Sequence, residues 1–185
     1  MNKSELEASS GTSTSVVAYR RNNTKLICRE METRDINVAL SIETESFEFP
    51  WPQSEFAQSV RGEERRGIVA EYDGFVVGYL IYEKRHNSYR LLSCAVSRLS
   101  RRQGVGACLL LALMKRLDVR HTRISCIVRE KNVVAQLFLR SHGFSAIRVL
   151  KEFYTSTQED AYRMNYRSDD WSLASDQIRQ RLLLR

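Results

Sequence analysis

The residues best suited to chemistry in this sequence are two arginines and two glycines in one short segment, Arg101-Arg102-Gln103-Gly104-Val105-Gly106. The first amide groups of a helix lack partners within the helix and carry a partial positive charge, so they bind phosphate. Glycines there let an anion approach the backbone, and arginines add charge-assisted hydrogen bonds. The segment is neither a Walker A loop nor a complete dinucleotide fingerprint. It predicts a pyrophosphate-binding turn, with an ordinary strand-to-helix connection as the alternative.

The elements around this segment favour phosphate binding. Ser88 to Val96 is typical of a strand, and Gly104 to Leu117 places leucines at helical spacing. A strand that leads through a glycine-containing turn into a long amphipathic helix is the context that such a motif requires.

Strands and helices alternate along the rest of the chain. We expect further strands over 25–30, 67–71, 75–83, 123–129, 144–154 and 161–166, and further helices near 33–42, from 54, and over 132–141. This order, β-α-α-β-β-β-α-β-α-β-β, predicts one mixed α/β domain over residues 25–166. Residues 1–24 are polar and predict a flexible tail. Residues 167–185 form an extension in which Ile178, Leu182 and Leu183 suit a short helix.

Composition narrows the class of protein. Of the 185 residues 43% are apolar, which suffices for one core, and no apolar run reaches the roughly 20 residues that span a bilayer. The polar start of the chain does not resemble a signal peptide, and the four scattered cysteines indicate reduced thiols. Without a cysteine pair or a histidine cluster, no metal site is expected. We therefore expect a cytoplasmic protein with no membrane partner.

The net charge of +7 reflects 29 basic and 22 acidic residues spread along the chain. Such an excess suits a polyanionic partner or a phosphate-bearing cofactor, and it equally describes a solvated basic surface. Because no basic stripe is interleaved with aromatic residues, direct nucleic-acid binding is not expected.

Four segments together resemble the GNAT N-acetyltransferases, and within them the RimI-type N-terminal protein acetyltransferases. The first is Val96 followed by the Arg101-x-x-Gly-x-Gly turn, which is similar to the family's motif A. The other three, which follow the family's order, are Glu43-x-x-x-Phe47-x-x-Pro50-Trp51, Asn132-x-x-Ala135 with Ser141-His142-Gly143-Phe144, and Phe153-Tyr154 with Glu159-Asp160-Ala161. The resemblance covers about residues 25–166.

The resemblance implies a single α/β domain of the GNAT fold, with a mixed, mostly antiparallel central sheet and helices on both faces. It implies acetyl-CoA as co-substrate, with the pyrophosphate on the amide groups from Arg102 to Ala107. Backbone groups on the preceding strand would align the acetyl and pantetheine arms, and the Asn132 side chain would hydrogen-bond the cofactor. The implied cofactor-binding residues are Cys94, Ala95, Val96, Arg101, Arg102, Gln103, Gly104, Val105, Gly106, Ala107 and Asn132.

The chain departs from the RimI pattern at the two positions that exchange protons. The pattern places Glu five residues before the asparagine and Tyr seven residues after it, where this chain has Ile127 and Leu139. The resemblance then leaves Glu43, Tyr154 and Tyr89 as candidate catalytic residues. Each has a structural alternative: an exposed helix residue, an edge-strand aromatic and sheet packing, respectively.

Two further side chains are weaker candidates. Glu130 lies in the right loop but has the character of a solvated charge, and Cys94 could carry an acyl group only if it is not a buried structural thiol.

Acetyl transfer to an α-amino group places modest demands on the protein. The pKa of an α-amino group is near 8, against about 10.4 for lysine, so part of it is neutral at pH 7. A backbone N–H, which we expect to be that of Val96, would stabilise the oxyanion. The leading hypothesis is acetylation of a protein N-terminus, for which the RimI resemblance suggests a ribosomal protein. The alternatives are a small amine or lysine acceptor, and an acetyl-CoA-binding module without catalysis, which Ile127 and Leu139 motivate.

Overall fold

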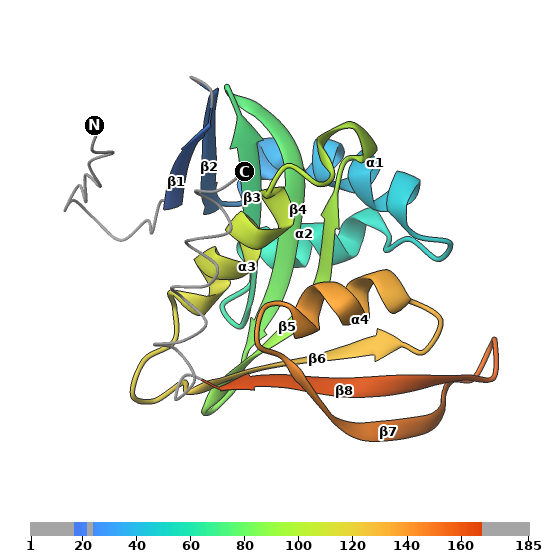
Figure 1. The fold of residues 1–185 in the computed structure, drawn as a ribbon. Helices are drawn as coiled ribbons and strands as arrows, with labels where there is room; N and C mark the ends of the chain where they lie inside the picture. The colour runs from blue at the N-terminus through green and yellow to red at the C-terminus, as the bar shows by residue number, and fades with distance from the viewer. Residues whose placement is uncertain (1–16, 22–23, 168–185) are drawn as a thin grey trace.

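A computed structural model of the chain describes residues 17–21 and 24–167 (Figure 1). They form one eight-stranded sheet in the order β1-β2-β3-β4-β5-β6-β8-β7. All neighbouring strands are antiparallel except β5 and β6, which are parallel. The strands are β1 (Val17–Arg21), β2 (Thr24–Glu30), β3 (Arg65–Tyr72), β4 (Phe75–Lys84), β5 (Ser88–Val96), β6 (Arg123–Arg129), β7 (Ser145–Tyr154) and β8 (Glu159–Arg167). The expected mixed, mostly antiparallel sheet is confirmed.

Helices cover both faces of this sheet, as expected. The α-helices are α1 (Ile36–Ser46), α2 (Gln53–Arg61), α3 (Val105–Met114) and α4 (Val133–Arg140), with 3-10 turns η1 (Thr33–Asp35) and η2 (Arg98–Ser100). Apolar residues of α3 and α4 join one core cluster with Leu26, Ile68 and Leu80 of the sheet. Those of α1 and α2 join a second cluster with Val69, Tyr79 and Ile81. Successive side chains of β4 therefore pack on opposite faces of the sheet, because side chains alternate between the two faces along a strand.

Three local expectations need correction. Residues 17–21, expected within a flexible tail, form β1, whose residues pair antiparallel with β2 from Val17–Cys28 to Arg21–Thr24. This pairing uses backbone groups, which leave little trace in a hydrophobic pattern. The helix expected near residues 33–42 begins as the 3-10 turn η1 at Thr33 and continues as α1 to Ser46, and the helix expected from residue 54 begins at Gln53, after Pro52. The rest of the tail and residues 168–185 lie outside the described residues.

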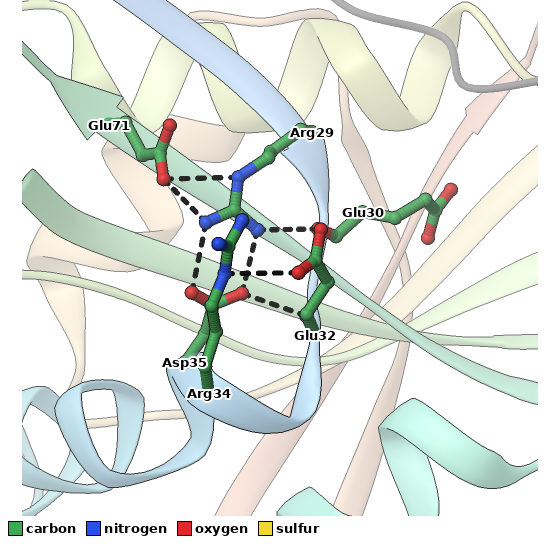
Figure 2. Close-up of polar contacts among 6 residues, drawn as sticks. All are labelled: Arg29, Glu30, Glu32, Arg34, Asp35 and Glu71. Carbon is green, nitrogen blue, oxygen red and sulfur yellow. Dashed lines mark hydrogen bonds and ion pairs between the residues drawn. The ribbon is translucent and has the colours of Figure 1, made fainter. Parts of the chain in front are cut away.

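A buried ion pair attaches the start of α1 to the sheet (Figure 2). Arg29 of β2 donates to both carboxylate oxygens of Asp35, at 2.7 and 2.9 Å, and its Nε donates to Glu71 of β3 at 3.0 Å. Asp35 also accepts the Glu32 backbone N–H at 2.7 Å, and it is only 4% exposed. Burial alone would raise the pKa of Asp35, but the hydrogen bonds from Arg29 and Glu32 outweigh it and lower the pKa. The carboxylate thus holds strand, turn and helix together.

We expect Asp35→Ala to lower the free energy of unfolding by about 3 kcal/mol at pH 7, because Arg29 loses its bidentate partner in a buried setting. Asp35→Asn removes the charge and keeps the shape. The pKa of Asp35 is lower in the folded state than in the unfolded state, where it is about 3.9, so the ionised carboxylate stabilises the fold above that pH. This stabilisation is lost as the pH falls through the folded-state pKa. Urea unfolding from pH 7 to 3 should therefore show the gap between parent and Asp35→Asn narrowing. A constant gap would contradict this role.

Candidate active site

The segment between β5 and α3 forms a turn with the geometry of an anion site. Gly104, immediately before α3, has φ of +85°, which glycine adopts without strain. The first backbone hydrogen bond of the helix runs from Cys108 N–H to Gly104 C=O. Within the described part of the chain, no hydrogen bond is donated by the amide groups from Arg102 to Ala107. These amides are available to bind an anion at the helix N-terminus.

The side chains of this turn have tasks that the sequence does not reveal. Arg101 donates to the Val96 carbonyl at 3.0 Å and to Ser46 Oγ at 3.1 Å, so it ties the end of β5 to the end of α1. Gln103 bridges back to the Leu99 carbonyl. A Cβ at Gly106 would lie 3.3 Å from the Phe138 ring of α4. Of the two arginines expected to contact the anion, Arg101 is thus engaged within the protein and Arg102 is exposed, while Gly106 lets α3 and α4 pack closely.

The parallel strands β5 and β6 separate immediately behind this turn. They pair only over Ser88–Arg90 and Arg123–Ser125, although β5 continues to Val96 and β6 to Arg129 (Figure 1). The Ser97 N–H bonds Val77 of β4, so alternation turns the peptide groups of Val96 and Cys94 toward the unpaired β6 side. The peptide groups of Ala95 face β4. Of the three residues expected to align the cofactor arms, only Cys94 and Val96 therefore direct backbone groups into this opening.

Asn132 lies at the start of α4, where its side chain serves the helix. Its Oδ1 accepts the Ala135 N–H at 3.1 Å as an N-cap, which leaves the side-chain NH₂ group available as the expected donor to a cofactor. The two positions that hold proton-exchanging residues in the RimI pattern carry apolar side chains in this chain. Ile127 is half-buried in β6, and Leu139 is 3% exposed within the core cluster of α3 and α4.

Glu43 is buried rather than exposed on its helix, which corrects the solvated alternative. It is 1% exposed, accepts the Trp51 N–H at 2.9 Å, and accepts hydrogen bonds from Tyr79 and Ser93. The two hydroxyls also lie 2.9 Å apart. Desolvation raises the pKa of Glu43, and the Trp51 and Ser93 hydrogen bonds only partly oppose this. Sequence reasoning missed Tyr79 and Ser93, although a tyrosine within an apolar strand indicates a hydroxyl that needs a buried partner.

A second polar group lies around Arg129, near the loop between α1 and α2. Arg129, at the end of β6, lies over the Tyr154 ring at 3.7 Å and over Phe49 at 5.4 Å, and bonds Glu159 at 2.8 Å. It thus connects the loop between α1 and α2 with the hairpin of β7 and β8. Desolvation raises the pKa of Tyr154, opposed by the charge of Arg129. The structure brings Tyr154 and Arg129 together, and sequence reasoning did not single out Arg129 or Phe49.

The remaining candidates lie elsewhere or have other partners. Tyr89 is at the opposite end of β5 from Val96, where its hydroxyl bonds the Arg116 carbonyl at 3.2 Å and its ring stacks on His121. This matches the packing alternative. Burial raises the pKa of Cys94 to about 12, so its thiol is protonated at neutral pH and suits a structural role. Glu130 accepts from Tyr162 at 3.4 Å. Among the described residues no group of side chains is arranged to hold a metal, and no helix is long and apolar enough for a bilayer.

Glu43→Gln should change how stability depends on pH. Because the folded-state pKa of Glu43 is raised, the protein is stabilised by this group below the unfolded-state value, near 4.3, and loses that stability as the pH rises through the folded-state value. Glutamine keeps the acceptor for Trp51 and does not ionise. Thermal unfolding should therefore show the variant gaining stability relative to the parent from pH 4 to pH 8. Glu45→Gln, a change on the same helix, is the control, and equal pH profiles for all three proteins would refute the assignment.

Comparison with known proteins places this geometry in a family. The family model described as Acetyltransferase (GNAT) family matches residues 36–144. The chain is similar to an uncharacterized N-acetyltransferase of Methanocaldococcus jannaschii, with 30% identity over 145 residues that cover 75% of this chain and 90% of the relative. It is 29% identical over 137 residues to the [ribosomal protein bS18]-alanine N-acetyltransferase of Escherichia coli, covering 72% and 92%.

Solved structures of acetyltransferases have a similar fold. The ribosomal-protein-S18-alanine N-acetyltransferase from Escherichia coli has a TM-score of 0.70 and 28% identity, covering 77% of this chain and 93% of that one. At 16% identity, Arabidopsis thaliana NAA60 in complex with acetyl-CoA shares the fold, with a TM-score of 0.68. The family model matches more than half of the chain, a solved member shares its fold, and β5 and β6 separate behind the turn before α3. The chain therefore belongs to the GNAT family of acetyltransferases.

Proposed function

We propose that this acetyltransferase transfers an acetyl group from acetyl-CoA to the α-amino group of a protein N-terminus, in the cytoplasm. The observation that carries the proposal is the opening between β5 and β6, which ends at the free amides of the turn before α3. An extended pantetheine arm would complete the hydrogen bonds of β5 while its pyrophosphate lies on the helix N-terminus. The four free cysteines suit a reducing compartment.

The acceptor side has the features that an extended peptide needs. The loop between α1 and α2 carries Phe49, which is 54% exposed, and the hairpin of β7 and β8 carries the half-buried Tyr154. Arg129 contacts both aromatic rings and so joins this loop to the hairpin. A peptide N-terminus entering between them would reach the thioester beside Val96. The names of the Escherichia coli relatives support a ribosomal protein as acceptor.

The residues at the opening suggest how the reaction proceeds without the family's usual base. The Val96 N–H faces the place of the thioester and would stabilise the developing oxyanion. The neutral fraction of the α-amino group attacks directly, and proximity supplies much of the rate. Glu43 is sealed by three donors, so it acts by positioning the 47–52 loop rather than by touching the acceptor. Tyr154 is the hydroxyl that would contact the amine or the departing thiolate.

A second candidate function is acetyl-CoA binding without catalysis, because Ile127 and Leu139 cannot exchange protons. A thiol-release assay with acetyl-CoA and a library of N-terminal peptides separates the candidates. Mass spectrometry of the product then distinguishes an α-amine from lysine or a small amine. Acetyl-CoA binding with no thiol release from any peptide would refute the proposed reaction and support the binding module.

Tyr154→Phe should reduce kcat by about 10- to 100-fold with a small change in KM, because a general acid or base contributes on the order of 10²-fold or more. Steady-state kinetics with the best peptide of the library measures this. Tyr162→Phe is the matched control, since Tyr162 lies on the neighbouring strand β8 and bonds the exposed Glu130 in the turn after β6. A change in KM alone for Tyr154→Phe would make the residue a binding contact.

Gly104→Ala should weaken acetyl-CoA binding by about tenfold or more, because a side chain at a φ of +85° strains the turn that presents the amides. Gly74→Ala has the same local cost at a φ of +86°, in the turn between β3 and β4, where an added Cβ meets nothing within 4 Å. Both variants should lose similar stability, and calorimetry should show weaker binding for Gly104→Ala alone. Equal affinities for the two variants would contradict phosphate binding at this turn.

A further inference from the structure

Three neighbouring strands, β6, β8 and β7, carry an unusual set of side chains on one face of the sheet. Their other face packs into the core of α3 and α4 through Ile124, Cys126 and Met164. Because side chains alternate along a strand, the residues in between point to the face on which Arg129 meets Phe49. On that face the three strands present four arginines, here called the arginine face: Arg123 of β6, Arg163 and Arg167 of β8, and Arg148 of β7.

Strand pairing sets these arginines opposite one another. Arg123 pairs with Arg167, and Arg163 pairs with Arg148. Like charges directly opposite each other on neighbouring strands repel and destabilise a sheet. Within the described residues, none of the four side chains forms an ion pair or a hydrogen bond. A negatively charged ligand would relieve this repulsion at two places at once.

The acidic residues of these strands have other positions or partners. Glu159, at the start of β8, bonds Arg129 at 2.8 Å. Asp160 points to the opposite face, where it bonds Lys151 at 2.6 Å. Glu152 lies where β7 and β8 lose register, with its N–H on Asp160. The arginine face is therefore a concentrated positive surface, assembled by strand pairing from residues too far apart in the sequence to form a basic stripe.

The arginine face is accessible to a ligand. α1 and α2 pack on β3, β4 and β5, and α4 lies on the opposite side of the sheet (Figure 1). Arg148 and Arg167 are exposed, and Arg123 and Arg163 are half-buried. The guanidinium groups can therefore bind a ligand that lies flat on these three strands.

The arginine face begins beside the acceptor opening. Arg163 pairs with Ile127, which is two residues before Arg129 on β6, so the Arg163–Arg148 pair lies about 7 Å from the row of Arg129. The second arginine pair lies about 13 Å further along the same strands. A peptide whose N-terminus reaches the thioester beside Val96 would leave the opening past Arg129 and continue onto this surface.

We propose that the arginine face binds an acidic segment of the acceptor protein, downstream of the acetylated N-terminus; this inference rests on the proposed function. Guanidinium groups bind carboxylates bidentately. An extended peptide places alternate side chains about 7 Å apart, which equals the spacing of the rows on the sheet. RNA also carries negative charge, but the row between the arginine pairs offers no aromatic ring on which a base could stack, since it consists of Ser125, Asn165 and Ser145.

Peptides that share one N-terminal sequence test the selection by charge. Their first three residues are those of a peptide that the thiol-release library shows to be acetylated, and the next six are rich in glutamate, glutamine or lysine. We expect kcat/KM to be about tenfold higher for the glutamate peptide than for the glutamine peptide at low salt, because two or three exposed ion pairs each contribute a factor of about two to three. Raising the ionic strength to about 0.5 M should remove most of this preference.

The double substitution Arg148→Gln/Arg163→Gln removes the arginine pair nearest the opening. It should lower the ratio of kcat/KM between the glutamate and glutamine peptides from about tenfold to about twofold. This ratio does not depend on the fraction of folded enzyme, because both peptides meet the same sample. The matched control, Arg66→Gln/Arg140→Gln, removes the same charge from the opposite face, since Arg66 pairs with Tyr82 of the α3 core and Arg140 ends α4. It should keep the ratio of the parent, and an equal loss in both double variants would overturn the proposal.

Binding of the same peptides, labelled with fluorescein at the C-terminus and followed by anisotropy, does not require catalysis. If no peptide is acetylated but the glutamate peptide binds and Arg148→Gln/Arg163→Gln abolishes its binding, the proposed function fails and the arginine face stands. Acetylation with equal kcat/KM for all three peptides would overturn the arginine face and leave the proposed function intact. An RNA duplex that binds more tightly than the glutamate peptide, and loses affinity only in Arg148→Gln/Arg163→Gln, would assign the surface to nucleic acid and also overturn the proposal.

Discussion

A β-strand edge carries peptide groups that must be hydrogen-bonded, and in this protein one such edge lies within the sheet. β5 and β6 pair over three residues and then separate, so the peptide groups of Cys94 and Val96 face a side without a strand partner. The surrounding structure keeps the strands apart. Arg101 ties the end of β5 to α1, while Gly106 lets α4, which follows β6, pack closely on α3. In the proposed function, a ligand with an extended, amide-bearing arm would complete this edge, and its phosphates would lie at the start of α3.

The two sides of the opening are built differently. On the β4–β5 side, the Glu43 carboxylate is buried with two hydroxyls and fixes the backbone of the loop at Trp51. On the β6–β7 side, Arg129 stacks on Tyr154 and Phe49 and is itself held by Glu159. The first arrangement is closed to solvent and suits positioning. The second is partly exposed and suits contact with an acceptor. Ile127, at the position where the RimI pattern has a glutamate, lies on the same strand as Arg129 and cannot exchange protons.

The outer layer of the fold shows how the turn is kept rigid. Because the amides of the turn include those of the first residues of α3, a movement of this helix would displace them. The sheet holds one side of α3, and Leu110 and Met114 are buried in the same core cluster as Leu139 of α4. At the opposite face, Arg29 and Asp35 hold the start of α1 in the same way, through charge rather than apolar contact.

The sequence by itself determined the features that depend on neighbours along the chain. Strand, turn and helix around Arg101–Gly106 follow from local periodicity and two glycines, and the loss of proton-exchanging groups follows from the identities of Ile127 and Leu139. It also predicted most strands and helices, because each has a pattern of its own. It missed β1, whose pairing leaves little hydrophobic signal.

Tertiary structure alone decided which side chains meet. Glu43, Tyr79 and Ser93 are far apart in the chain, as are Phe49, Arg129 and Tyr154, and their meeting depends on the sheet register and helix placement. The same register turned the peptide groups of Val96 toward the opening and those of Ala95 away from it, and placed Tyr89 at the far end of β5. A shift of one residue would reverse each of these directions, because the period of a strand is two. The identity of a residue limits what it can do, while long-range pairing decides where it acts.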